Sequence, residues 1–209
     1  MMLQGCDVSH YDGEPDFAAY YDSGGKFVWQ KATQGVGGRD PTLGRNVKSG
    51  RAAGLYVGVY HVWVPGDDID CQAHNFFGAL SDAGVDRVGM LVPALDIEQE
   101  LAEQTSPDIL VADMLGLIAF VERVTGRGCV IYACRSTIEQ IGQAANGDAL
   151  GAYPLWIAEY GVEQPTIPAV WSEWAFWQTA ETGLAQGGFV NDLDVFAGEV
   201  ADIEKLVVR

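Results

Sequence analysis

Short apolar stretches recur along the chain and alternate with segments whose apolar residues return every three or four positions. The apolar stretches predict strands, and the segments between them predict helices. The eight predicted strands are Gly5–Ser9, Phe27–Thr33, Tyr56–Val62, Met90–Ile97, Cys129–Ala133, Pro154–Tyr160, Ala175–Thr179 and Asp192–Phe196. Between Tyr153 and Phe196 there are turns but no helical pattern, so we expect only strand and loop there.

The clearest helix is predicted at Asp108–Val124, where apolar residues from Ile109 onward have helical spacing and Ser106-Pro107 marks the start. The shorter predicted helices are Asn46–Ala53, Ile69–Leu80, Ser136–Ala144 and Asp202–Val208. Acidic residues at Asp67-Asp68 precede the helix Ile69–Leu80. Because acids favour a helix N-terminus, we expect them to cap it.

Strands and helices that alternate with short connections are typical of a parallel α/β sheet. Eight strands in 209 residues predict one domain, residues 1–209, built as a TIM-like barrel that lacks some outer helices. In such a barrel, function collects at the carboxyl ends of the strands. Polar side chains at those ends are therefore the candidates for chemistry.

The chain is strongly acidic, with 29 Asp and Glu against 12 Lys and Arg and a formal net charge of −17. Such a charge repels nucleic acids and anionic membranes, so neither is an expected partner. No apolar run is long enough to span a bilayer. Three histidines without metal-binding spacing predict no catalytic metal, and four cysteines without a CxxC pair predict mostly buried thiols.

The predicted strand Met90–Ile97 is apolar until its end, where Asp96 and Glu98 stand two positions apart. Side chains at i and i+2 of a strand point the same way. Two close carboxylates cannot both ionise freely, so one of them has a raised pKa and can serve as an acid near neutral pH. The alternative is that these acids cap a helix or face solvent just past the strand.

Further acids lie in the first and last predicted strands. Asp7 is near the end of the first, and Asp192 and Asp194 share one face of the last. Closure of the barrel makes these strands neighbours and brings Asp7 and Asp192 within reach of the acids that end Met90–Ile97. The four converging acids, Asp7, Asp96, Glu98 and Asp192, form a pocket suited to glycoside hydrolysis.

Aromatic and polar side chains accompany the acids near the predicted strand ends. The aromatic residues are Tyr60, Trp63, Tyr132, Trp156, Tyr160 and Trp177. Aromatic rings at a pocket rim can stack on sugars, and a few placed polar groups can fix their orientation. The predicted substrate-binding residues are Tyr60, Tyr132, Trp156, Lys31, Gln178 and Asp194. Several aromatic residues can equally belong to the core, and we expect this of Trp177.

Seven short motifs occur in one order between residues 5 and 198. They are Asp7-Val8-Ser9, Lys31-Ala32-Thr33-Gln34-Gly35, Gly58-Val59-Tyr60-His61, Leu95-Asp96-Ile97-Glu98, Pro154-Leu155-Trp156-Ile157-Ala158, Trp177-Gln178 and Asp192-Leu193-Asp194-Val195-Phe196. In this order and spacing they resemble the glycoside hydrolase family 25 lysozymes, the Chalaropsis-type muramidases. The resemblance implies an irregular, flattened eight-stranded α/β barrel that cleaves the β-1,4 bond between N-acetylmuramic acid and N-acetylglucosamine in peptidoglycan.

The resemblance also implies roles for the four acids. Glu98 matches the general acid that protonates the leaving oxygen, Asp96 matches its partner, and Asp7 and Asp192 match the outer pair of the cluster. Attack by the substrate's N-acetyl group, by a carboxylate or by water all stay open. No cofactor is implied. One departure from the family pattern is Gln34, where the family most often has Glu, and another is Val62-Trp63 in place of a Phe.

Two other functions compete with this interpretation. A cell-wall glycan-binding domain on the same barrel, without catalysis, would need the aromatic rings but not all four acids. A chitinase-like glycosidase would carry more acids along Leu91–Glu98, which has only the last two.

No basic and apolar signal segment is seen at the start of the sequence. We therefore expect synthesis in the cytoplasm, that of the host if the chain is a phage endolysin, and action on the wall after release. Peptidoglycan strands are the expected partner. Targeting to the wall would come from the barrel, from a part of the protein outside this sequence or from a partner.

Overall fold

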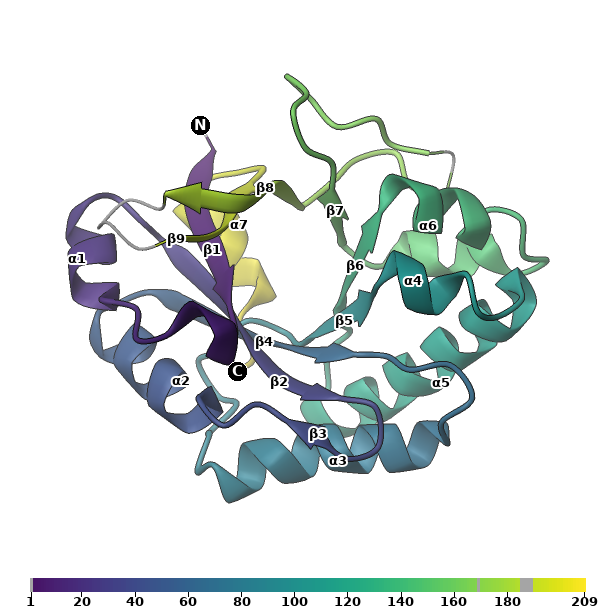
Figure 1. Ribbon diagram of the computed structural model, residues 1–209, viewed down its shortest axis with the longest axis horizontal. Coiled ribbons are helices and arrows are strands. Elements are labelled where there is room, and N and C mark those ends of the chain that lie inside the picture. The colour runs from purple at the N-terminus through teal and green to yellow at the C-terminus, as the bar shows by residue number, and fades with distance from the viewer. Residues whose placement is uncertain (1, 169, 185–189) are drawn as a thin grey trace.

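The computed structural model describes residues 2–168, 170–184 and 190–209, and a closed β-barrel forms its centre (Figure 1). The ring strands are β1 (Leu3–Val8), β2 (Phe27–Gln34), β4 (Tyr56–Val62), β5 (Ala94–Ile97), β6 (Val130–Cys134), β7 (Leu155–Ala158), β8 (Phe176–Leu184) and β9 (Val190–Phe196). They follow the order β1-β9-β8-β7-β6-β5-β4-β2, and β1 pairs with β2 to close the ring. The two-residue β3 (Gly38–Arg39) pairs with β2 outside it. The predicted eight-stranded barrel is confirmed.

The direction of the last strand differs from the prediction of a parallel barrel. β9 runs antiparallel to both β8 and β1, whereas the other ring pairs are parallel. A parallel pair needs a crossover of a dozen or more residues, and β8 and β9 are too close in sequence for one. The barrel is therefore mixed, and its last two strands form an antiparallel pair.

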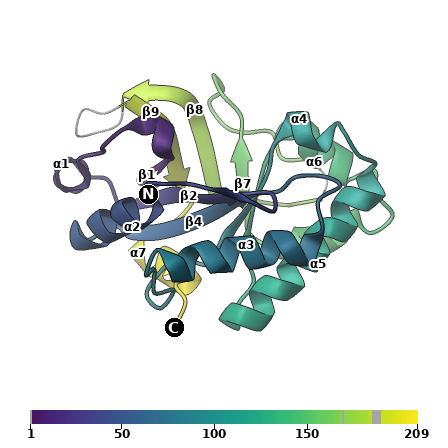
Figure 2. The ribbon, with the colours of Figure 1, turned by 60° about the horizontal axis from the view of Figure 1, so that its bottom comes forward.

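Helices lie along the outside of the barrel, with α3 beside α5 (Figure 2). They are α1 (Phe17–Asp22), α2 (Leu43–Ala52), α3 (Ile69–Asp82), α4 (Gln99–Ala102), α5 (Pro107–Thr125), α6 (Arg135–Ile141) and α7 (Val200–Ile203), with 3-10 turns at His10–Asp12, Gly147–Ala152 and Glu204–Leu206. The short α1 and α4 were not predicted. The predicted helix Asp202–Val208 is instead the end of α7 followed by a 3-10 turn.

The two longest helices begin where the capping residues predicted. The Ser106 hydroxyl accepts a hydrogen bond from the Ile109 amide at 3.4 Å, and α5 ends at Gly126, whose φ of 69° is left-handed. The Asp68 carboxylate accepts from the Cys71 amide at 2.9 Å and caps α3. Ile109 is exposed, although it fits the apolar spacing of α5. Among the described residues, no helix has the length and hydropathy to cross a bilayer.

Large side chains fill the interior of the barrel. Trp29 and Trp156 stack with their ring centroids 5.2 Å apart, and Phe176 meets Trp29 edge-on at 5.3 Å. Phe27 and Phe196 belong to the same interior cluster. A second apolar layer lies between the barrel and the helices. Because the interior is filled, a ligand has to bind at the mouth of the barrel.

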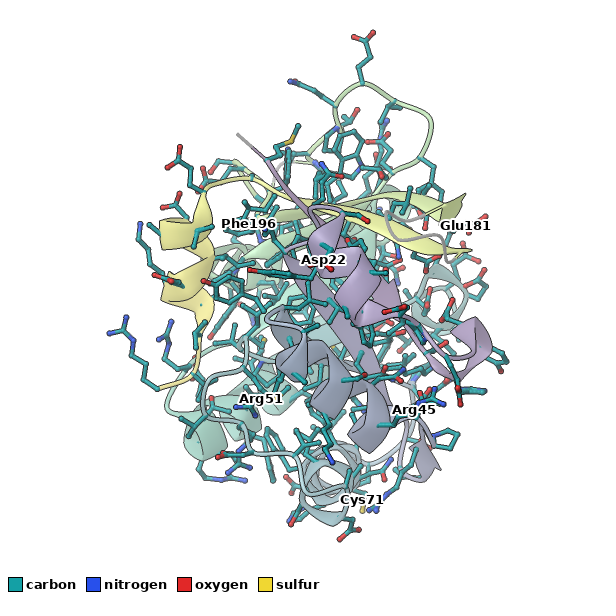
Figure 3. All side chains as sticks on the ribbon, turned by 90° about the vertical axis from the view of Figure 1, so that its left-hand side faces the viewer. Asp22, Arg45, Arg51, Cys71, Glu181 and Phe196 are labelled. Carbon is teal, nitrogen blue, oxygen red and sulfur yellow. The ribbon has the colours of Figure 1, made fainter. Side chains whose placement is uncertain are left out.

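The alternation predicted for the last strand is confirmed. Phe196 points into the barrel interior, whereas Val195 packs in the outer layer. Trp177 also lies in the outer layer, as expected. Figure 3 shows Phe196 and Glu181 at opposite ends of the β8–β9 pair.

The cysteines only partly follow the prediction of buried thiols. In the described part of the chain no disulfide joins any of the four, and Cys6 and Cys129 are buried. Cys71 lies exposed on α3 (Figure 3), and Cys134 is half-buried at the end of β6.

Gly58 on β4 leaves the space that Trp29 occupies, since a Cβ at this position would lie 2.2 Å from the Trp29 ring. We predict that Gly58→Ala lowers the free energy of unfolding by about 1–3 kcal/mol, because the clash overpacks the barrel interior. Gly37→Ala is the control, since a Cβ there meets nothing within 4 Å, and it should change stability by less than about 0.5 kcal/mol. Urea unfolding measures both, and equal midpoints for the two variants would contradict the packing described above.

Candidate active site

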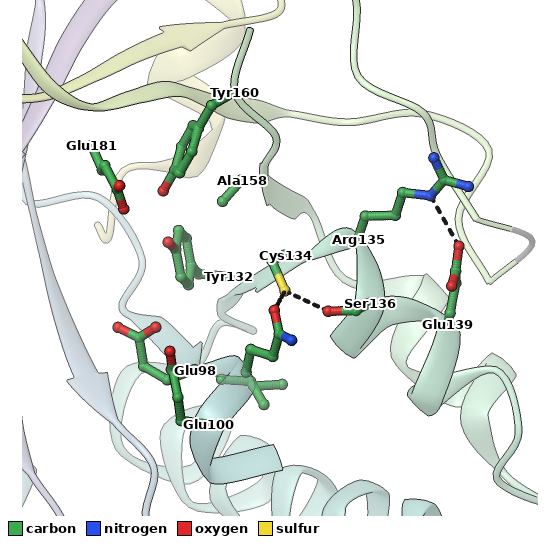
Figure 4. Close-up of a pocket in the computed structure, with 12 residues that line it drawn as sticks. Glu98, Glu100, Tyr132, Cys134, Arg135, Ser136, Glu139, Ala158, Tyr160 and Glu181 are labelled. Carbon is green, nitrogen blue, oxygen red and sulfur yellow. Dashed lines mark hydrogen bonds and ion pairs between the residues drawn. The ribbon is translucent and has the colours of Figure 1, made fainter. Parts of the chain in front are cut away.

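A cavity of about 530 Å³ lies at the carboxyl ends of β5, β6 and β7, beside β8 (Figure 4). Its charged lining residues are Glu98, Glu100, Arg135, Glu139 and Glu181. A larger cavity of about 670 Å³ lies near the start of β7 and the end of β9, but none of the predicted catalytic acids lines it. The first cavity is therefore the candidate active site because Glu98 lines it, although the second cavity is larger.

Asp96 lies near the end of β5, and Glu98 directly follows the strand, as the sequence pattern predicted. Glu98 holds the N-cap position of α4, but its side chain makes no capping hydrogen bond, so the carboxyl is not used as a helix cap. Asp96 lies beneath it, 5% exposed, and its Oδ1 has no hydrogen-bond partner. β5 thus presents one carboxyl at the cavity wall and a second, buried one below.

The surroundings of both carboxyls favour their neutral forms. Burial raises the pKa of Asp96 well above its usual value, and the charge of Glu98 adds to this effect. Partial desolvation also raises the pKa of Glu98, with further contributions from the charges of Glu100 and Glu181. The charge of Lys31 lowers the pKa values of both carboxyls. Although Glu98 as a whole is exposed, its carboxyl therefore keeps a proton to higher pH than an ordinary glutamic acid.

The outer acids meet because β9 is antiparallel. Asp7 near the end of β1 stands directly opposite Asp192 near the start of β9. In a parallel barrel the start of the last strand would lie at the opposite rim, so Asp192 would be far from Asp7. Asp194 is buried one pleat deeper on the same face.

These three acids share hydrogen bonds that require protons. Burial is the main cause that raises the pKa of Asp192 to about 9 and that of Asp194 to about 8. Burial and the neighbouring Asp194 also raise the pKa of Asp7 well above its usual value. The cluster is thus largely protonated at neutral pH. In the described part of the chain, no group of three or more His, Cys, Asp or Glu side chains is placed to hold a metal ion.

Gln178 on β8 connects the acids to two tyrosines. Its Nε2 donates to Asp7 Oδ2 at 2.7 Å and to Asp192 Oδ2 at 3.2 Å. Its Oε1 accepts from the hydroxyl groups of Tyr132 at 2.8 Å and Tyr160 at 2.6 Å. Both tyrosines line the cavity (Figure 4).

Several residues that we predicted to contact a glycan lie below the cavity instead. Trp156 is 2% exposed, and its Nε1 donates to Asp194 Oδ1 at 2.8 Å. Tyr60 is also buried and meets Trp156 edge-on at 6.3 Å. Gln178 is 3% exposed. These side chains support the site from beneath and present little or no surface to a ligand.

Tyr132 and Lys31 are the predicted binding residues nearest to solvent. Tyr132 lines the main cavity. Lys31 is half-buried, donates to Gln34 Oε1 at 3.1 Å and lines a smaller cavity of about 140 Å³ together with His10. The charge of Lys31 also influences the main site, because it lowers the pKa values of Asp96 and Glu98.

Glu100 and Glu181 were not predicted as site residues, and Tyr160 was named only among the aromatic residues at strand ends; all three line the cavity. Tyr160 ends a predicted strand, and Glu100 follows Glu98 by two positions, so the sequence carried a signal for both. Glu181 follows a register shift between Gln178 and Ala180. Because such an irregularity changes which side chains share a face, simple alternation could not have found Glu181.

Known proteins are similar to this chain in sequence and in fold. Lysozyme M1 of Streptomyces globisporus is 30% identical over 197 residues, which cover 92% of this chain and 66% of that protein, slightly less than two thirds of its length. The N,O-diacetylmuramidase of Chalaropsis sp. is 30% identical over 216 residues and 98% of each chain. The crystal structure of the bacterial lysozyme from Streptomyces coelicolor superposes with a TM-score of 0.86 at 28% identity, over 98% of this chain and 96% of that one.

The family model described as Glycosyl hydrolases family 25 matches residues 6–188. This range includes Asp7, the carboxyl pair that ends β5, and Gln178. The match spans most of the chain, and the solved lysozyme shares its fold. The chain therefore belongs to family 25 of the glycosyl hydrolases, the lysozyme family that its motifs resembled.

Proposed function

We propose that this protein is an N-acetylmuramidase that cleaves the β-1,4 bond between N-acetylmuramic acid and N-acetylglucosamine in peptidoglycan. The observation that carries the proposal is the carboxyl pair of β5, in which Glu98 has a raised pKa at a cavity wall and Asp96 lies buried beneath it. The names of the relatives, a lysozyme and an N,O-diacetylmuramidase, support the choice of substrate.

In the proposed reaction Glu98 is the general acid. Its proton goes to the glycosidic oxygen while the bond from that oxygen to the anomeric carbon breaks, and the bonding electron pair leaves with the oxygen. Positive charge develops on the anomeric carbon and ring oxygen. Asp96 supplies a hydrogen-bond acceptor nearby, since its Oδ1 has no partner within the protein. Water supplies the hydroxyl group of the new reducing end and releases its other proton, which restores the proton of Glu98.

Protonation of the outer acids also suits a wall substrate. Stem peptides and muramic acid carry carboxylates, and a chain with a net charge of −17 repels them at long range. At the mouth of the barrel, however, Asp192 and Asp194 hold protons at neutral pH, which lowers the local negative charge. A glycan can therefore approach Glu98 without meeting a full set of carboxylates.

We predict that Glu98→Gln lowers the rate of peptidoglycan cleavage by about 10²- to 10⁴-fold, because the amide cannot donate the proton that the leaving oxygen needs. Mass spectrometry of isolated walls from several bacteria should detect new muramic-acid reducing ends with the wild type. Glu163→Gln is the control, since Glu163 is exposed and does not line the main cavity, and it should match the wild type.

The same experiment tests the competing glycan-binding function. Wild-type protein that binds wall glycan as tightly as Glu98→Gln, and releases no reducing ends from any wall, would contradict the proposed catalysis and favour a binding domain.

The pH dependence of activity should follow the pKa of Glu98. The protonated form is active, so kcat/KM on soluble wall fragments falls as pH rises through that pKa. We predict that Glu100→Gln moves this alkaline limb to lower pH, because it removes a charge that raises the pKa of Glu98. Lys31→Met should move the limb to higher pH, because Lys31 lowers that pKa. Shifts in one common direction, or none, would refute the assignment of the acid.

The cellular role is a further proposal: an endolysin made in the cytoplasm that meets the wall after the membrane is breached. The substrate class supports it, because peptidoglycan lies outside the membrane. When the protein is produced inside a bacterium whose isolated wall it cleaves, we predict that culture density holds until a membrane-permeabilising agent is added and then drops. Lysis without the agent, with active protein in the medium, would show export by another route.

A further inference from the structure

We propose that Gln178 is the positioning residue of this active site. It orders Asp7 and Asp192, and it turns the hydroxyl hydrogens of Tyr132 and Tyr160 away from the cavity, so that both tyrosines meet the glycan as hydrogen-bond acceptors. The inference rests on the proposed function and specifies which substrate groups the site recognises: N–H and O–H donors.

The amide of Gln178 is fully used within the protein. A glutamine side chain has two N–H donors and a carbonyl oxygen with two lone pairs. The two N–H groups go to Asp7 and Asp192, and the two lone pairs take the hydroxyls of Tyr132 and Tyr160. At 3% exposure the amide has no room to exchange these partners for water. A sugar therefore does not bind Gln178 directly, in contrast to our prediction from the sequence.

The place of Gln178 in the barrel explains why this residue can connect the two groups. Its backbone pairs with Ala158 of β7 on one side and with Asp194 of β9 on the other. Tyr132 and Tyr160 come from the β6–β7 side of the mouth, whereas Asp7 and Asp192 come from β1 and β9. Gln178 thus ties the part of the mouth that carries the tyrosines to the part that carries the outer acids.

The bonds to Gln178 decide how the tyrosines meet a ligand. A phenol has one hydrogen to donate and an oxygen that accepts. Because the hydrogens of Tyr132 and Tyr160 point to Gln178, the hydroxyl oxygens have only acceptor capacity left for the cavity. Burial raises the pKa of both hydroxyls, so they stay protonated and this polarity persists. The acetamido N–H and the hydroxyls of a glycan fit such acceptors, and a carboxylate or phosphate does not.

Two variants of similar size separate positioning from packing. Gln178→Met fills the volume without hydrogen bonds, and its kcat/KM on soluble wall fragments should fall about 10²-fold at every pH, because the reacting groups lose their alignment. Gln178→Glu keeps an acceptor for the tyrosines but puts a carboxylate against Asp7 and Asp192. We predict that its activity relative to wild type rises as pH falls, since a protonated Glu can again donate.

Controls exclude loss of fold as the cause. Gln143→Met changes an exposed glutamine away from the cavity and should match the wild type. Tyr160→Phe removes one hydroxyl from a side chain that is 41% exposed, and it should raise KM about 3- to 10-fold with little change in kcat. Wild-type kinetics for Gln178→Met, or a Gln178→Glu ratio that does not vary with pH, would overturn the proposal.

A readout besides activity separates this inference from the proposed function. In a ¹H–¹⁵N spectrum of wild-type protein, the side-chain amide signals of Gln178, assigned by their loss in Gln178→Met, should exchange slowly with solvent and shift as the acid cluster titrates. If the wild type cleaves no wall but shows these signals, the proposed function fails and the positioning role stands. Rapid exchange of the Gln178 amide in an active enzyme would refute the positioning role alone.

Discussion

The direction of β9 is the constraint on which the rest of the active site depends. An antiparallel last strand starts at the rim where its neighbours β1 and β8 end, so Asp192 meets Asp7 instead of lying across the barrel from it. The same arrangement leaves Gln178 on β8 between the tyrosines and the acids. Had the chain returned through a crossover helix, the mouth would hold Asp7 and the carboxyls that end β5, but Asp192 would lie at the opposite rim.

Desolvation is the main cause of the raised pKa values of Asp7, Asp192 and Asp194. The aromatic interior below the mouth, with Trp29 stacked on Trp156, excludes water from one side of the cluster. Buried carboxyls in such a place stay neutral unless they are paired with cations, and here they share protons and the amide of Gln178. Trp156 and Gln178 thus act from beneath the site, as supports for the groups that face the glycan. Burial of the acids themselves raises their pKa values, whereas the hydrogen bonds from Gln178 to Asp7 and from Trp156 to Asp194 lower them.

The sequence predicted the parts that local patterns encode. An apolar strand that ends in Asp96 and Glu98, and a helix bounded by Ser106 and Gly126, follow from periodicity and capping. The direction of β9 was not predicted, because its alternation is the same whether it runs parallel or antiparallel. Glu181 was missed because a register shift reorders the faces of β8. The burial of Trp156 was missed because aromatic residues suit a core and a sugar site equally well.

Catalysis by Glu98 depends on surroundings that keep its carboxyl protonated above the usual range of a glutamic acid. A ¹³C NMR titration of the wild-type protein tests this most directly, with the Glu98 carboxyl signal assigned by its loss in Glu98→Gln. We expect a midpoint clearly above the value of about 4.3 for an unperturbed glutamic acid. A midpoint at or below that value would show that the surroundings of Glu98 do not favour its protonated form.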